Sequence, residues 1–142
     1  MLKQVLYSST ANTDITMRDV LEIIRVSHNR NSKSGLTGGL LFLDGYFYQL
    51  LEGIPSDVDA AMQRIQRDWR HHDVHVRRQQ RVTSPVFTDD WMALRSDAQI
   101  PTEVLQEYHY QPGMPAERYQ ADDLFAFLIA CFENELHQQM VH

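Results

Sequence analysis

Cysteine is nearly absent from this chain of 142 residues, which has a single one, Cys131. One cysteine excludes an intramolecular disulfide and a zinc site built from four cysteines. The chain also lacks a run of 18 uninterrupted apolar residues, and its first residues lack the apolar core of a signal peptide. The sequence therefore predicts a cytoplasmic protein that does not enter a membrane.

An excess of basic residues is absent as well. Lysine and arginine number 13 against 19 acidic residues, which gives a net charge of −6. This balance gives no support to direct binding of nucleic acid or of anionic membranes. The apolar share of 43% and the charged share of 23% are ordinary for a globular protein. A chain of this length forms one domain of usual size, with room for a short appendage.

Proline is scarce overall, and three of the five prolines gather in one late segment together with a glycine. Pro101, Pro112, Gly113 and Pro115 interrupt residues 97–120, whereas the preceding sequence is dense in strand and helix patterns. We therefore predict a compact domain over residues 1–96. A C-terminal helical extension is predicted over residues 97–142.

The compact domain contains runs typical of strands and of amphipathic helices. Strands are predicted over residues 2–8, 36–43, 46–51, 74–82 and 91–94. Asp44-Gly45 is a strong signal for a two-residue hairpin turn. Thr16 with Asp19 and Ser56 with Asp59 are spaced as capping boxes at the starts of two helices. Helical spacing then predicts these buried positions: Met17, Val20, Leu21, Ile24 and His28 in the first helix, and Val58, Met62, Ile65 and Trp69 in the second.

The order of these elements is β-α-β-β-α-β followed by an extra strand. This order predicts an α+β fold of the ferredoxin-like, split βαβ type, with two helices on one face of a mostly antiparallel sheet. Strand alternation places Gln49 on the same face as Phe47 and Leu51, which is the face that the helices cover. Tyr7 shares its face with Val5 in the same way, so a polar slot is expected between the helices and the sheet.

Several short motifs at fixed spacing resemble the BLUF family, which senses blue light with a flavin. They are Tyr7-Ser8-Ser9, Arg30-Asn31, Gly35-Leu36-Thr37-Gly38, Phe47-Tyr48-Gln49-Leu50-Leu51-Glu52-Gly53 and Asp68-Trp69-Arg70-His71. The resemblance covers residues 1–95. It implies a flavin held between the two helices, with FAD favoured and FMN or riboflavin left open. The cofactor-binding residues that it implies are Ile23, Arg30, Asn31, Gln49, Arg64, Ile65 and Asp68.

The resemblance also implies a photochemical mechanism without substrate turnover. Tyr7 would give an electron and a proton to the excited flavin and then recover both. Gln49 would rearrange its hydrogen bonds, because a side-chain amide has a donor end and an acceptor end. Met92 would pass the change to the last strand and so to an unidentified partner protein. The chain departs from the family at Trp91, which is displaced by one residue, and a shift of one residue moves a side chain to the other face of a strand.

Other classes of site fit the sequence less well. His71, His72 and His75 match no standard metal spacing, so no metal site is predicted. Residues 35–39 are rich in glycine but lack the lysine of a phosphate-binding loop. The remaining alternatives are a small acyl-phosphate hydrolase that uses Arg30-Asn31 and an interaction module without flavin.

The C-terminal extension contains an apolar stripe with helical spacing. Its members, four residues apart, are Leu124, Leu128, Phe132 and Leu136. A preceding helix is predicted over residues 102–110, after Pro101. We expect the stripe to cover the sheet face that the two core helices leave open, and its outer edge to join subunits of a homo-oligomer.

Overall fold

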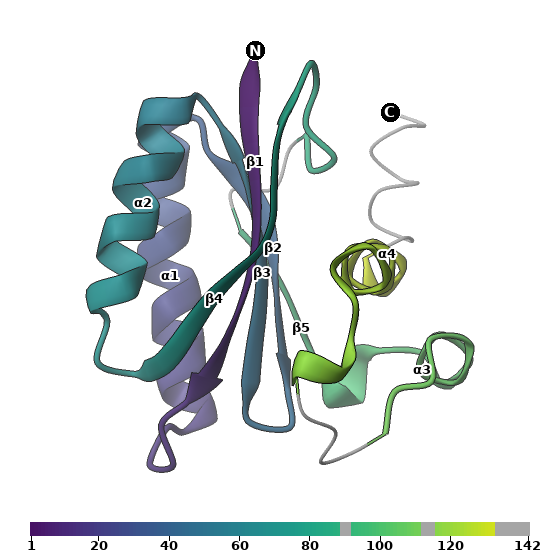
Figure 1. Cartoon of the computed structure of the whole chain (residues 1–142). Helices are drawn as coiled ribbons and strands as arrows, with labels where there is room; N and C mark the ends of the chain where they lie inside the picture. The colour runs from purple at the N-terminus through teal and green to yellow at the C-terminus, as the bar shows by residue number, and fades with distance from the viewer. Residues whose placement is uncertain (89–91, 112–115, 133–142) are drawn as a thin grey trace.

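The computed structural model describes residues 1–88, 92–111 and 116–132 and forms three layers (Figure 1). The middle layer is a sheet of five strands, with helices on both of its faces. The strands are β1 (Leu2–Ala11), β2 (Thr37–Leu43), β3 (Tyr46–Gly53), β4 (His71–Val82) and β5 (Ala93–Ser96). The helices are α1 (Met17–Ser34), α2 (Pro55–Arg67), α3 (Thr102–Glu107) and α4 (Ala121–Cys131), with short 3₁₀ turns at Asp97–Gln99 and Ala116–Arg118.

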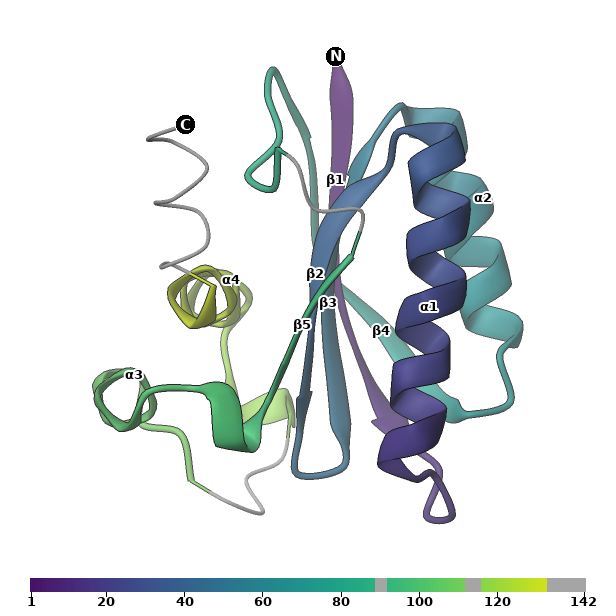
Figure 2. The ribbon, with the colours of Figure 1, turned by 180° about the vertical axis from the view of Figure 1, so that it is seen from behind.

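The sheet has the strand order β4-β1-β3-β2-β5. All neighbouring strands are antiparallel except β2 and β5, which are parallel. Helices α1 and α2 lie on one face, and α3 and α4 lie on the other, as the view from behind confirms (Figure 2). The predicted ferredoxin-like α+β fold with an extra strand and two helices on one face is thus confirmed.

Local signals set the boundaries of several elements. The predicted capping box at Thr16 is confirmed, since its side chain accepts from the Asp19 backbone and the Asp19 carboxylate accepts in return. Asp44 and Gly45 turn the β2–β3 hairpin with φ angles of 52° and 83°, the left-handed region that a two-residue turn of this type requires. The second predicted capping box is wrong. Helix α2 follows Ile54 without a side-chain cap, because Pro55 already fits its first turn.

Two of the predicted buried stripes were only partly right. Val20, Val58 and Met62 are buried, but Met17 and Leu21 on α1 are exposed. Trp69 lies beyond the end of α2 at Arg67 and is exposed as well. Strand β1 also continues past the predicted end at Ser8 to Ala11.

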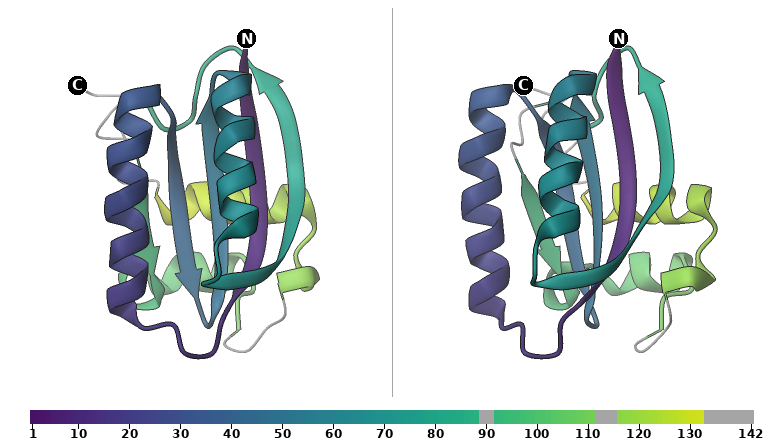
Figure 3. Two further views of the ribbon diagram at one scale, coloured as in Figure 1. Left: turned by 90° about the vertical axis from the view of Figure 1, so that its left-hand side faces the viewer. Right: turned by 60° about the vertical axis from the view of Figure 1, so that its left-hand side comes forward.

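Each face of the sheet has its own apolar core. On the α1–α2 face, Val5, Tyr7 and Phe47 from the strands pack with residues of both helices. On the other face, Leu6 and Tyr48 belong to a core that includes α4. Helix α4 runs across the strands of this second face (Figure 3). The strand alternation predicted from the sequence is therefore confirmed.

The C-terminal extension covers the open sheet face, as predicted. Leu124, Leu128 and Phe132 are buried in the second core, whereas Leu136 and Trp91 lie outside the described residues. Helix α3 ends earlier than predicted, and β5 begins two residues later than predicted. Within residues 1–88, 92–111 and 116–132, the structure has no helix that is long and apolar enough to cross a membrane.

Candidate functional site

A cavity of about 450 Å³ lies between α1, α2 and the sheet. Figure 3 shows the two helices side by side over this face. Its volume is in the range of small-molecule sites, about 300–1,000 Å³. Every residue predicted to bind a cofactor lines it: Ile23, Arg30, Asn31, Gln49, Arg64, Ile65 and Asp68. Tyr7 lines it too, so the fold brings together residues that are spread over most of the first 70 positions.

The sheet wall of the cavity carries three residues joined by two hydrogen bonds. Tyr7 on β1 lies directly opposite Gln49 on β3 in the strand register. The Tyr7 hydroxyl donates a hydrogen bond to Oε1 of Gln49. The Nε2 amide group of Gln49 donates in turn to the sulfur of Met92, at 3.2 Å. Both ends of the Gln49 amide are therefore occupied, and their partners fix which end faces which neighbour.

Burial controls the ionisation of Tyr7. Its side chain is only 3% exposed. Desolvation, together with the charge of the Asp68 carboxylate, raises the pKa of the phenol well above its ordinary value. Tyr7 therefore keeps its proton throughout the physiological pH range, and this proton lies on the hydrogen bond to Gln49.

The helix walls suit a flat ring with a polar edge. Ile23 from α1 and Ile65 from α2 supply apolar surface to the cavity. Asn31, near the end of α1, is 3% exposed, and its backbone carbonyl accepts from the N–H of Gly35 at 2.7 Å and of Leu36 at 3.1 Å. These bonds fix the position from which the Asn31 amide, with one acceptor and two donors, lines the cavity. The residues present thus fit the isoalloxazine ring of a flavin.

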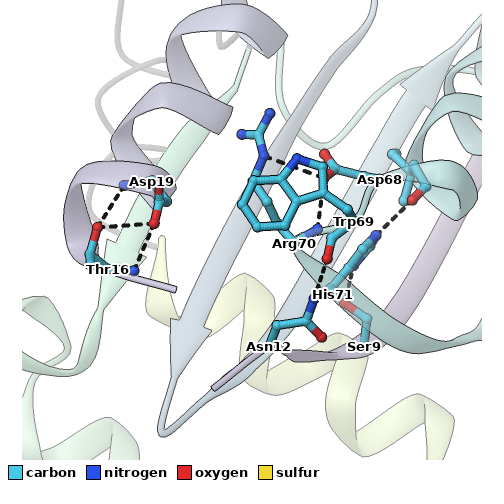
Figure 4. Close-up of polar contacts among 9 residues, drawn as sticks. Ser9, Asn12, Thr16, Asp19, Asp68, Trp69, Arg70 and His71 are labelled. Carbon is cyan, nitrogen blue, oxygen red and sulfur yellow. Dashed lines mark hydrogen bonds and ion pairs between the residues drawn. The ribbon is translucent and has the colours of Figure 1, made fainter. Parts of the chain in front are cut away.

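His71 is a cavity residue to which the sequence analysis assigned no role. Figure 4 shows its ring between Ser9 and α2. Its Nε2 lies 2.6 Å from the Ile65 carbonyl oxygen, and its Nδ1 lies 2.7 Å from the Ser9 hydroxyl. Because a carbonyl only accepts, Nε2 carries the proton, which fixes the tautomer of a neutral ring. The ring also packs edge-on against Tyr7 and Phe47, at 6.4 and 6.0 Å between centroids.

His71 therefore supports the Tyr7 wall of the cavity by packing. The motif Asp68-Trp69-Arg70-His71 contained the signal for this residue, but its partners come from β1 and α2, and only the fold brings them together. His72 bonds instead to Asn12, at 2.7 Å. Across the part of the chain that the structure describes, no group of three or more His, Cys, Asp or Glu side chains is placed to hold a metal ion.

The glycines at residues 38 and 39 lie inside β2, where no helix begins. A Cβ atom at Gly39 would approach the Phe87 ring to 2.7 Å and the Phe132 ring to 3.0 Å. Close packing against the second core explains this glycine, and a phosphate cradle is not needed to explain it.

Comparison with known proteins assigns the chain to a family. The family model described as sensors of blue light using FAD, BLUF, matches residues 2–93. The chain belongs to the BLUF family. A blue light- and temperature-regulated antirepressor, BluF, of Escherichia coli (strain K12) is 34% identical over 74 residues, 52% of this chain and 18% of that protein. A photoactivated adenylate cyclase subunit beta of Euglena gracilis is 32% identical over 90 residues, 63% of this chain and 10% of that protein.

The chain thus spans less than a fifth of the length of these two curated relatives. Solved structures of similar size agree with the fold. The dark-state structure of BlrB, a BLUF protein, superposes with a TM-score of 0.72 at 25% identity and covers 91% of this chain and 96% of its own. The photo-activated state of BlsA superposes with a TM-score of 0.81, covering 92% and 94%, and at 21% identity it supports the fold alone.

Proposed function

We propose that this chain is a blue-light sensor that binds one flavin in the cavity between α1 and α2 and turns over no substrate. The observation that carries the proposal is the hydrogen-bonded chain Tyr7–Gln49–Met92 on the cavity wall. A bound flavin supplies the absorption of blue light and, once excited, an oxidising centre. The protein supplies the side chains that hold the ring and those whose hydrogen bonds change when the ring is excited.

Ile23 and Ile65 would lie against the two faces of the ring, and Asn31 would pair with its polar edge. Arg30 and Arg64 also line the cavity and are exposed. A guanidinium group suits the flat face or the carbonyl edge of such a ring. Asp68 holds Arg70 in place at 3.3 Å, which supports this edge of the site.

Tyr7 is the side chain that can give an electron and a proton together and recover both, because its phenol is buried and protonated. Its proton already lies on the bond to Oε1 of Gln49. Rotation of the Gln49 amide by half a turn would bring Nε2 toward Tyr7 and Oε1 toward Met92. A thioether has no proton to donate, so the Gln49–Met92 hydrogen bond would be lost. Met92 would then report the state of the amide to β5, which begins at the next residue.

The output of this switch is proposed to be a change in protein contacts. Phe125 and Ile129 on α4 pack against the second core but stay half-buried, unlike the fully buried Leu124 and Leu128. We propose that their side of α4 joins subunits of a homo-oligomer or receives a partner protein in the cytoplasm. An Ile129→Glu variant would place a charge at this edge, and light scattering should then report a smaller assembly at unchanged flavin content.

The experiment that tests the function is the absorption spectrum of the purified protein. A yellow protein with about one flavin per chain, whose spectrum moves slightly to longer wavelength under blue light and returns in the dark, is the expected result. A colourless protein that fails to take up added FAD would contradict the proposal. That outcome would favour an interaction module without flavin, whereas hydrolysis of an acyl phosphate would favour the small hydrolase.

A further inference from the structure

A large aromatic side chain lies open at the rim of the cavity. Trp69 lines the cavity, yet its surface is 64% exposed. Tryptophan is highly buried on average in folded proteins, and an exposed indole is a place where a flat group can stack. Neither the apolar core nor the Tyr7–Gln49–Met92 chain uses this ring, so its position calls for a separate explanation.

The backbone on both sides of Trp69 is held in place. The Asn12 side chain donates a hydrogen bond to the Trp69 carbonyl oxygen. The Asp68 carboxylate accepts from the Arg70 backbone N–H at 3.0 Å and pairs with the Arg70 guanidinium at 3.3 Å. Figure 4 shows these contacts, with the indole beside the Arg70 side chain. These contacts hold the backbone that carries the indole, which lowers the entropic cost of ordering this segment when a ligand binds.

Positive charge gathers at the same rim. Arg64 and Arg67 lie in the last turn of α2, and Arg70 follows three residues after α2 ends. The Arg70 guanidinium carbon lies 5.9 Å from the centre of the Trp69 ring. Guanidinium groups bind phosphate oxygens through paired hydrogen bonds. An indole that lies near one guanidinium group and shares its cavity with those of Arg64 and Arg67 is thus a combination that fits an aromatic base joined to phosphates.

We propose that Trp69, Arg67 and Arg70 form a subsite for the nucleotide end of FAD. The adenine stacks on the Trp69 indole, and the two phosphates lie against the arginines. The inference rests on the proposed flavin site, whose ring contacts at Tyr7 and Gln49 are the same for all flavins. Riboflavin has neither phosphate nor adenine, FMN has one phosphate, and FAD has both groups. The site should therefore rank FAD above FMN and FMN above riboflavin.

The test is a titration of flavin-stripped protein with FAD, FMN and riboflavin, followed by flavin fluorescence. Trp69→Ala should weaken FAD binding by about 5- to 150-fold, the effect of losing one base–aromatic stack. FMN and riboflavin should bind this variant as they bind the original protein. Trp69→Phe should keep part of the preference for FAD. Leu21→Ala is the matched control, because Leu21 is also a large exposed apolar residue, 54% exposed, but does not line the cavity.

The arginines are tested separately. Arg67→Gln should weaken FAD and FMN but not riboflavin, and added salt should reduce the difference, since exposed charge pairs are screened. Equal affinity of the original protein for all three flavins would overturn the subsite and leave the proposed flavin site intact. Equal weakening of all three by Trp69→Ala would overturn it too. Failure of all three to bind the original protein would end both proposals.

Discussion

The two faces of the sheet place their tyrosines in opposite surroundings. On the α1–α2 face, the Tyr7 hydroxyl bonds to Gln49 at the wall of a cavity of about 450 Å³. On the α4 face, Phe127 packs among the rings of Tyr108, Tyr110 and Tyr119, with ring centroids 5.4–5.9 Å apart. The first face is built around space for a ligand, and the second is packed for stability.

One segment touches both faces. Met92 accepts from Gln49 on the cavity side. Phe87, five residues earlier, is fully buried on the other side and meets the Phe132 ring edge-on at 5.2 Å. The Arg95 guanidinium, three residues after Met92, lies 5.2 Å from the centre of the same Phe132 ring. Met92 thus lies in the chain between two residues that contact Phe132 at the end of α4, so a movement of Met92 can reach this helix. Substitutions on each face can test the comparison of the two faces.

The largest expected effect comes from Tyr7→Phe. The variant keeps the bulk of the ring and should still bind flavin, but it should lose the light-induced spectral shift completely, because the phenolic proton is gone. Gln49→Leu should lose the shift as well, since no rotatable amide remains. The readout is the difference spectrum before and after blue light.

Tyr48→Phe is the matched control for this loss. It removes the same hydroxyl from a buried tyrosine on the opposite face of the same sheet. A normal shift in Tyr48→Phe and none in Tyr7→Phe would support the distinction between the faces. A normal photocycle in Tyr7→Phe would show that the proposed switch is wrong.

The second prediction concerns the packed face. Phe127 is fully buried among three tyrosine rings, so Phe127→Ala should lower the free energy of unfolding by about 3–5 kcal/mol. Flavin affinity of the folded variant should change little, because Phe127 is on the far side of the sheet from the cavity. Urea unfolding and a flavin titration measure the two quantities. A loss of flavin affinity without a loss of stability would contradict the conclusion that the α4 face serves stability and the α1–α2 face serves binding.

The third prediction concerns the segment that joins the faces. Glu52 is 0% exposed, and its carboxylate accepts from the backbone N–H groups of Val86 and Phe87 at 2.8 and 2.9 Å and from Gln4 at 2.8 Å. Glu52→Gln replaces one of the two acceptor oxygens by an NH2 group. This NH2 group is itself a donor and would face an N–H donor that the carboxylate now accepts from. The unfolding free energy should fall by about 1–3 kcal/mol, the cost of one unpaired buried polar group.

Asp59→Asn is the control for loss of charge alone. Asp59 pairs with Lys3 at 2.6 Å near the surface, with 55% of its side chain exposed. Exposed pairs contribute about 0–1 kcal/mol, so this variant should be nearly as stable as the original protein. Equal effects of the two substitutions would mean that burial of Glu52 does not matter for the segment.

Features set by neighbours in the chain could be predicted from the sequence. The Thr16–Asp19 cap and the Asp44-Gly45 turn depend on contacts within a few residues, and both are present. Strand alternation placed Tyr7 and Gln49 on one face because side chains alternate regardless of the rest of the fold. The cap predicted at Ser56 was wrong, because a second local signal, the preceding proline, starts the helix earlier.

Features set by distant contacts were missed. Trp69 continued the helical spacing of α2 in the sequence, but the chain leaves the helix after Arg67 and turns the indole to solvent. The role of His71 could not be predicted, since its partner Ser9 is 62 residues away and Ile65 contributes a backbone carbonyl. Backbone acceptors carry no sequence signature, so a site built partly from them becomes visible only in the folded chain.

The smallest predicted effect is the response of the packed face to alkaline pH. Burial raises the pKa of the Tyr119 phenol from 10.0 to about 12, and burial likewise raises the pKa of the Cys131 thiol from 9.0 to about 12. Above pH 9 the unfolded chain releases protons that the folded chain keeps, so the unfolded state is increasingly favoured as the pH rises. Stability from these groups is complete below pH 9 and is lost progressively toward pH 12. Urea unfolding at pH 8 and pH 10.5 should show the decrease, and Tyr119→Phe, with one titrating group fewer, should show a smaller one. An equal decrease in both proteins would mean that Tyr119 does not contribute to it.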